Sequence, residues 1–161
     1  MKKTLIALCM LFVAFNVQAQ EPDAAEEQAI AMELAAIDLE MKVDTELFQK
    51  MSTNMYVSQS PKAMVMGMIV PETYENAITK LEGNLPPGFK VTNKGEKMMN
   101  GVNTMSLEGT IESPEGVINC IMYYTKRDAD TCTVFMGMSE VGVDKKYTDA
   151  ITAAANSIIK K

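Results

Sequence analysis

Short apolar runs separated by polar turn residues recur between residues 89 and 138, which is the pattern of a β-meander. Segment 63–70 predicts a first strand. The Asn100-Gly101 pair is typical of a two-residue β-hairpin turn. Because closely spaced strands with short turns pair antiparallel, we predict four further antiparallel strands, over residues 89–97, 103–112, 117–125 and 131–138.

Apolar residues at helical spacing predict two helices that flank the meander. Pro71 is expected to open the first helix, because the N–H that proline lacks has no partner in a first helical turn. Gly83 is placed to end it. Asp144 predicts the N-cap of a closing helix, whose apolar stripe consists of Tyr147, Ile151, Ala154 and Ile158.

The stretch before the first strand fits two patterns. One is a helical spacing of four apolar residues, Ile30, Leu34, Ile37 and Met41. The other is a strict alternation of apolar and polar residues over 37–44, and a helix and a strand exclude each other there. We favour a helical or loose segment followed by a strand over 37–43, a helical turn over 46–51 and a short strand over 54–58.

The first 19 residues have the three parts of a secretory signal peptide. Two lysines precede an apolar run, which ends in the small residues Val17 and Ala19. This run is too short for a permanent membrane anchor, and no later run approaches bilayer length. We therefore expect cleavage after Ala19, a periplasmic or secreted location without a membrane span, an acidic helical or flexible segment over 20–36, and a single domain over 37–161.

Charge and residue types narrow the possible chemistry. The chain has 15 basic and 21 acidic residues, a net charge of −6, and an acidic protein repels the phosphates of nucleic acids. It contains no histidine, which is the usual general base near neutral pH and a common ligand of zinc and haem iron. These properties argue against a nucleic-acid partner, histidine-based catalysis and a cofactor.

Together these elements predict an α+β domain, a mostly antiparallel sheet with helices packed on its faces. Their order resembles the PsbP-like fold, which occurs in a photosystem II subunit and in small bacterial periplasmic proteins such as DcrB. The resemblance rests on strand 63–70 before Pro71-Glu72-Thr73-Tyr74, on Gly95-Glu96-Lys97 before the Asn100-Gly101 turn, and on the closing helix. It implies a non-enzymatic binding or assembly factor.

Methionine is unusually frequent, with 15 copies. On strands, Met64, Met66 and Met68 would project from one face, and Met136 and Met138 repeat this spacing. Three interpretations stay open: core packing, which suits a flexible thioether; an adaptable apolar surface for a partner; and a Cu(I) site, since soft thioethers favour Cu(I) over zinc or iron. We assign no metal site from the sequence and keep these methionines as copper candidates.

Cys120 and Cys132 are the cysteines that would remain after signal cleavage, and an oxidising periplasm favours a disulfide between them. The hairpin geometry opposes this bond. If Thr125 pairs with Thr131, the cysteines share a face but lie about four residues, roughly 13 Å, apart along the strands. A disulfide and two buried thiols therefore both stay open.

The function favoured by the sequence is that of a periplasmic or secreted accessory or binding protein, not an enzyme, with an unknown envelope protein as partner. A thioether Cu(I)-binding protein is the first alternative, and a small carboxylate-based hydrolase is the second. Opposed carboxylates in a deep cleft would favour the hydrolase. Thioethers gathered at an opening would favour the copper-binding protein. A shallow apolar surface would favour the accessory or binding protein.

Overall fold

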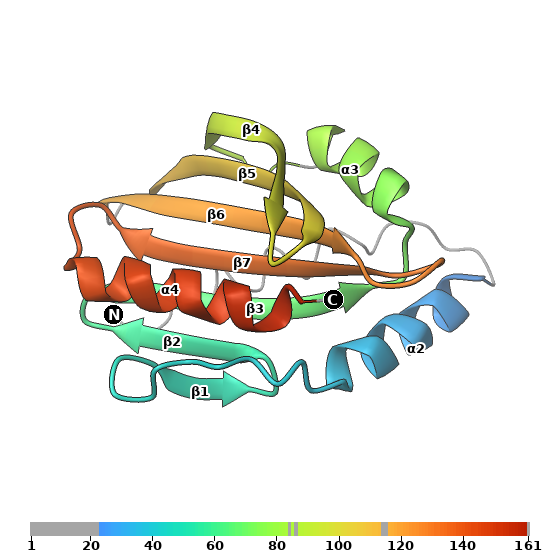
Figure 1. Ribbon diagram of the computed structural model, residues 1–161, viewed down its shortest axis with the longest axis horizontal. Coiled ribbons are helices and arrows are strands. Elements are labelled where there is room, and N and C mark those ends of the chain that lie inside the picture. Colours follow the sequence, from blue (N-terminus) through green and yellow to red (C-terminus); the bar gives the residue numbers. More distant parts are fainter. Residues whose placement is uncertain (1–22, 84, 86, 114–115, 161) are drawn as a thin grey trace.

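The computed structural model describes residues 23–83, 85, 87–113 and 116–160, so the expected signal peptide over 1–19 lies outside the described residues. Seven strands form one antiparallel sheet in the spatial order β1-β2-β3-β7-β6-β5-β4 (Figure 1). In chain order they are β1 (Gln49–Ser52), β2 (Met55–Gln59), β3 (Lys62–Val70), β4 (Phe89–Met99), β5 (Val102–Ser113), β6 (Gly116–Lys126) and β7 (Cys132–Glu140). The described helices are α2 (Asp23–Ala36), α3 (Tyr74–Gly83) and α4 (Lys145–Ile158).

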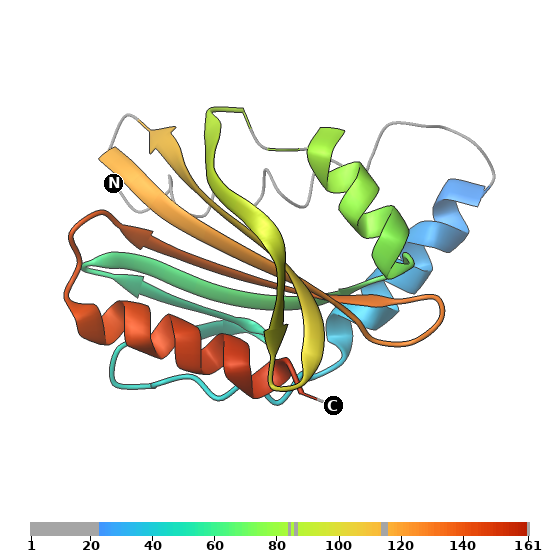
Figure 2. The ribbon, with the colours of Figure 1, turned by 45° about the horizontal axis from the view of Figure 1, so that its top comes forward.

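Helices α3 and α4 cover opposite faces of the sheet (Figures 1 and 2). Helix α4 lies across β3 and β7, where Ile151 joins a core that contains Val65 and Phe135. Helix α3 packs beside β6 on the other face and contributes Tyr74 and Leu81 to two further clusters. The predicted α+β class is confirmed. No helix in the described part of the chain is long and apolar enough to cross a membrane.

The predicted meander is confirmed, because β4, β5, β6 and β7 are neighbours both in sequence and in space. Asn100 and Gly101 connect β4 to β5 with φ angles of 50° and 76°, as a tight hairpin turn requires. The side-chain amide of Asn100 also donates hydrogen bonds to the carbonyls of Asn156 and Ile159, at 2.9 and 2.8 Å. The tip of this hairpin is thereby fastened to the C-terminal end of α4 (Figure 2).

Both predicted helices exist, but one start is displaced. Helix α4 begins as predicted, since the Asp144 carboxylate accepts a hydrogen bond from the backbone N–H of Lys146 at 3.0 Å. Helix α3 begins at Tyr74 and not at Pro71. The reason is that the Thr73 hydroxyl accepts a hydrogen bond from the backbone N–H of Asn76 at 3.2 Å, so Thr73 acts as the cap.

The prediction of a strand over 37–43 is wrong, because these residues form no strand and pair with none of the seven described strands. The side chain of Asn54 satisfies its backbone instead: the amide donates to the Ile37 carbonyl at 2.7 Å and accepts from the Leu39 N–H at 3.0 Å. The alternation reports burial only, since Leu39 and Met41 pack into the core beside α4.

The helical turn predicted over 46–51 is also wrong over most of its length. A turn over 45–47 leads into β1, which begins at Gln49. The short strand predicted over 54–58 is confirmed as β2.

Candidate functional site

Ten sulfur-containing side chains gather on the face of the sheet that α3 covers, and we call this the sulfur face. They belong to two hydrophobic clusters and are Met55, Met64, Met66, Met68, Met105, Cys120, Met122, Cys132, Met136 and Met138. The structure therefore places all five methionines singled out from the sequence on this one face.

The strand register arranges most of these side chains in two rows. In the first row, side chains stand opposite one another on β2, β3, β7 and β6, in the order Met55, Met66, Met136 and Met122. The second row runs over β3, β7 and β6 and consists of Met64, Met138 and Cys120. Met68 stands opposite Val134 and joins neither row. Because opposite residues have Cβ atoms about 5 Å apart, the thioethers within a row are direct neighbours.

Exposure differs along these rows. Met64, Met122, Met136 and Met138 expose between 1% and 4% of their surface. Leu81 of α3 packs in the same cluster, so these buried methionines form part of the core, a use that suits their flexible side chains. Met55, Met66 and Met68 are only partly buried. Met55 and Met66 therefore form the accessible end of the first row.

Sequence reasoning missed Met55 and Met122 as members of this arrangement. Both lie in segments predicted as strands, so the signal for their direction was present. Met55 pairs with Met66, and Met122 with Met136, between consecutive strands. The union of these two pairs in one row, however, depends on the pairing of β3 with β7, two strands that are distant in the chain. No local pattern encodes that pairing.

Cys120 and Cys132 are unbonded and buried, so the disulfide considered from the sequence is absent. The expected pairing of Thr125 with Thr131 is also wrong. Cys120 stands opposite Met138, which is six positions from Cys132 along β7. This offset corresponds to roughly 20 Å at the usual rise per residue, well beyond the reach of a disulfide.

Burial raises the pKa of both thiols from 9.0 to about 12. We therefore expect Cys120 and Cys132 to resist a thiol reagent in the folded protein at pH 8, because the thiolate is the reactive form.

The raised pKa values also make the stability of the fold depend on pH. Because folding favours the protonated thiols, their contribution to the free energy of unfolding is fully present below the unfolded pKa of 9.0, and it is lost as the pH rises toward 12. Thiol titration with and without guanidinium, and denaturation at several alkaline pH values, measure both effects. Fast labelling of the folded protein would contradict the first expectation, and a stability that does not fall above pH 9 would contradict the second.

A polar cluster lies on the opposite face, where Lys97 reaches from β4 across β5 to β6. Its ammonium lies 4.5 Å from the ring centre of Tyr123, 3.3 Å from the Tyr123 hydroxyl and 3.9 Å from the Glu108 carboxylate. The residues of β5 that it passes are small and buried, Thr104 and Ser106. The Ser106 hydroxyl has no hydrogen-bond partner among the described residues. This cluster ties β4 to the rest of the sheet.

Strand β4 forms one edge of the sheet, and no described strand pairs with its outer side. Its burial pattern leaves only the first and the last of its 11 residues partly buried, and all the others are exposed. Lys90, Lys94 and Lys97 bring positive charge to this edge. A bulge interrupts its pairing with β5 between Val91 and Asn93.

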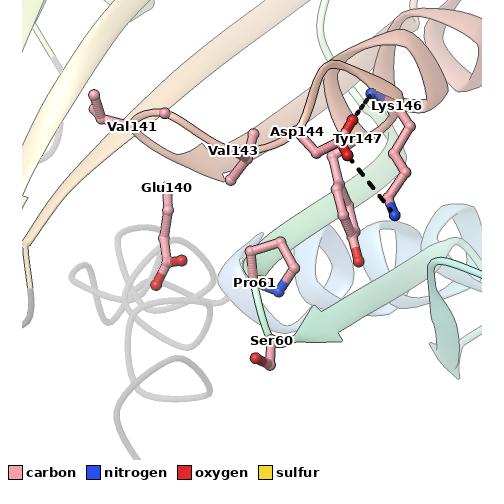
Figure 3. Close-up of a pocket in the computed structure, with 9 residues that line it drawn as sticks. Ser60, Pro61, Glu140, Val141, Val143, Asp144, Lys146 and Tyr147 are labelled. Atoms are coloured by element: carbon pink, nitrogen blue, oxygen red, sulfur yellow. Dashed lines mark hydrogen bonds and ion pairs between the residues drawn. The ribbon is translucent and has the colours of Figure 1, made fainter.

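A hollow of about 480 Å³ lies between the β2–β3 turn and the loop from β7 to α4 (Figure 3). Its ionisable groups are those of Glu140, Asp144, Lys146 and Tyr147. Asp144 is engaged as the cap of α4, and Glu140 points away from it in Figure 3. The two carboxylates are thus not opposed as in a glycosidase. Within the described ranges, no three Cys, Asp or Glu residues form a metal-binding group.

No family model and no curated protein sequence matches this chain. The solved structures that are similar to it include LpqN and PA94. LpqN, involved in cell envelope biogenesis of Mycobacterium tuberculosis, has a TM-score of 0.52 and 11% identity, over 71% of this chain and 78% of LpqN. PA94 of Pseudomonas aeruginosa, a protein of unknown function, has a TM-score of 0.53 and 13% identity, over 70% of this chain and 85% of PA94. These similarities show a shared fold.

Proposed function

We propose that this protein is a non-catalytic accessory protein of the cell envelope, which binds a partner protein along β4. The fold that it shares with LpqN, a protein involved in cell envelope biogenesis, supports this assignment. The secretory pattern of residues 1–19 supports a periplasmic or secreted location. The order of the elements supports placing the fold with the PsbP-like proteins, which act mostly by binding and assembly.

The open edge of the sheet is the observation that carries the proposal. Strand β4 is exposed along nearly its whole length, Phe89–Met99. An exposed edge strand presents unpaired backbone N–H and C=O groups, to which an extended segment of another protein can add as a further strand. The opposite edge, β1, has only four residues and is a shorter template.

The lysines of β4 select among possible occupants of this edge. Strand β4 carries three lysines and one glutamate, Glu96. Pairing with β4 of a second copy would therefore bring two strands of net positive charge together, and like charges on adjacent strands oppose such pairing. An acidic extended segment would be attracted by the same lysines. Lys90 and Lys94 therefore favour a partner protein with an acidic segment over self-association.

Reversing the charge of two edge lysines should abolish capture of this partner. Immobilised wild-type protein is expected to retain a specific protein from a native envelope extract, and retention should weaken as salt is added. The Lys90→Glu/Lys94→Glu variant should lose it, because the attraction becomes repulsion. Lys50→Glu is the matched control, since Lys50 is an exposed lysine on the other edge strand, and it should capture the partner normally.

Two outcomes would contradict the proposal. Equal capture by the Lys90→Glu/Lys94→Glu variant would exclude β4 as the binding edge, and the lack of any specific partner in the extract would exclude the accessory role. The variant removes the surface interactions of both exposed lysines, among them the ion pair of Lys90 with Glu112, and surface ion pairs contribute only about 0–1 kcal/mol each. It should therefore stay folded, which its thermal unfolding curve verifies.

A further inference from the structure

We propose that Met55, Met66 and Met136 form a Cu(I) site of three thioethers on the sulfur face, separate from the β4 edge. The three residues stand opposite one another on the adjacent strands β2, β3 and β7. Met55 and Met66 are partly exposed, whereas Met136 is 3% exposed. Two reachable thioethers thus lie beside one that is held in the core.

The distribution of methionine over the two faces of the sheet points beyond ordinary packing. On β3, Ala63 and Val65 face α4, whereas Met64 and Met66 face the other way. On β7, Phe135 faces α4, and the residues on either side of Gly137 that face away are Met136 and Met138. A general need to fill irregular space would place methionine on both faces. Both faces of β7 and the face of β3 toward α4 are buried, yet the thioethers of these two strands all lie on the face away from α4.

The geometry of adjacent strands allows the three sulfur atoms to converge. Neighbouring strands lie about 4.8 Å apart, so Met66 is flanked at this spacing by Met55 on one side and Met136 on the other. A methionine side chain has three rotatable bonds. The two outer side chains can therefore incline their sulfur atoms toward Met66 without a change in the backbone.

The ligand type selects the metal. Thioethers are soft, uncharged ligands, which favour Cu(I) over harder ions such as magnesium, calcium or manganese. The chain has no histidine to favour zinc, nickel or Cu(II) instead. The partial exposure of Met55 and Met66 keeps the bound cation in contact with solvent, which lowers the cost of placing a charge beside an apolar core.

A competition with a coloured Cu(I) chelator under anaerobic conditions tests the site. The wild-type protein should withdraw one Cu(I) per chain, and X-ray absorption should show sulfur ligands only. Met55→Leu/Met66→Leu should withdraw none, because leucine keeps the volume but lacks the sulfur. Met32→Leu/Met98→Leu is the matched control: both methionines lie on the surface, 75% and 67% exposed, and copper uptake should be unchanged.

The proposal is overturned if the wild-type protein takes up no copper, or if Met55→Leu/Met66→Leu takes it up normally. Loss of copper uptake in Cys120→Ala would also overturn the proposal, because it would show that the ion binds in the second row, to which Cys120 belongs. If the variant fails to fold, NMR of the methionine methyl groups in the wild-type protein still tests the site. On addition of Ag(I), a soft analogue of Cu(I), the largest changes in chemical shift must fall on Met55, Met66 and Met136. Partner capture by Met55→Leu/Met66→Leu should be normal, which separates this site from the β4 edge.

Discussion

Replacing Phe135 by alanine should lower the free energy of unfolding by about 3–5 kcal/mol, the range for a large aromatic side chain lost from a core. Phe135 is 0% exposed in the centre of β7. Its ring stacks on that of Tyr123, with centroids 6.0 Å apart and planes at 18°. The substitution removes this contact and leaves a cavity between the sheet and α4. Because whole domains are stable by only about 5–15 kcal/mol, much of the total should be lost.

Chemical denaturation of the variant and the wild-type protein measures this loss. Val141→Ala is the matched control, since Val141 is also a large apolar residue but is 58% exposed in the loop after β7. Its free energy of unfolding should stay within about 0.5 kcal/mol of the wild-type value. Similar losses in the two variants would contradict the packing of α4 on this face of the sheet.

The inward direction of Phe135 could be predicted from the sequence, because its strand and the three before it pair with neighbours in the chain. For such strands, a period of two and the intervening turns specify both the element and its faces. Asn100-Gly101 is the clearest case, since both residues adopt the positive φ that the turn demands. The closing helix was predictable for a similar reason: its cap, Asp144, and its apolar stripe are local.

The segment over 37–43 shows where a local pattern is insufficient. Alternation states that one side of an extended chain is buried, but a strand also needs a partner for its backbone. Here the partner is one side chain, Asn54, which binds the backbone of both Ile37 and Leu39. The alternation is the same whether the backbone binds a side chain, as here, or pairs with a neighbouring strand.

The position of the two cysteines was misjudged because of one loop. The Asp128 carboxylate accepts hydrogen bonds from the N–H and the hydroxyl of Thr131, at 2.8 and 2.7 Å, and thereby holds Thr131 in the loop. The hydroxyl bond is also the largest cause of a lowered pKa at Asp128. Pairing consequently starts with Lys126 opposite Cys132 and not with Thr125 opposite Thr131. A side chain that competes with the strand thus shifts the whole register.

Both candidate sites depend on the order of the strands, which the sequence pattern does not state. The five methionines could be assigned to common faces from their spacing, but the row of Met55, Met66 and Met136 requires β3 to lie between β2 and β7. Likewise, the lysines of β4 matter for binding only because β4 ends the sheet. The packing of the whole domain decides which distant segments pair, so the order of the strands becomes known only from the structure.

Gly137→Ala should lower the free energy of unfolding by about 1–3 kcal/mol through overpacking. A Cβ atom at Gly137 would lie 2.3 Å from Cγ2 of Ile151 and 3.1 Å from Cγ1 of Ile121, so α4 must move away from β7 to admit it. Gly95→Ala is the control, because nothing lies within 4 Å of a Cβ atom there. Its effect should be small or stabilising, since alanine restricts the unfolded chain. Denaturation midpoints compare the two variants.

A double-mutant cycle identifies the contact responsible for this loss. Ile151→Ala removes Cγ2 and leaves a cavity, at a cost of about 2–5 kcal/mol. In Gly137→Ala/Ile151→Ala the new methyl group occupies space that the isoleucine has vacated, so the combined loss should be smaller than the sum of the two single losses. Strict additivity would mean that Gly137 does not set the distance between α4 and the sheet. The coupling therefore tests directly whether the absence of a side chain on β7 is what allows the closing helix to pack.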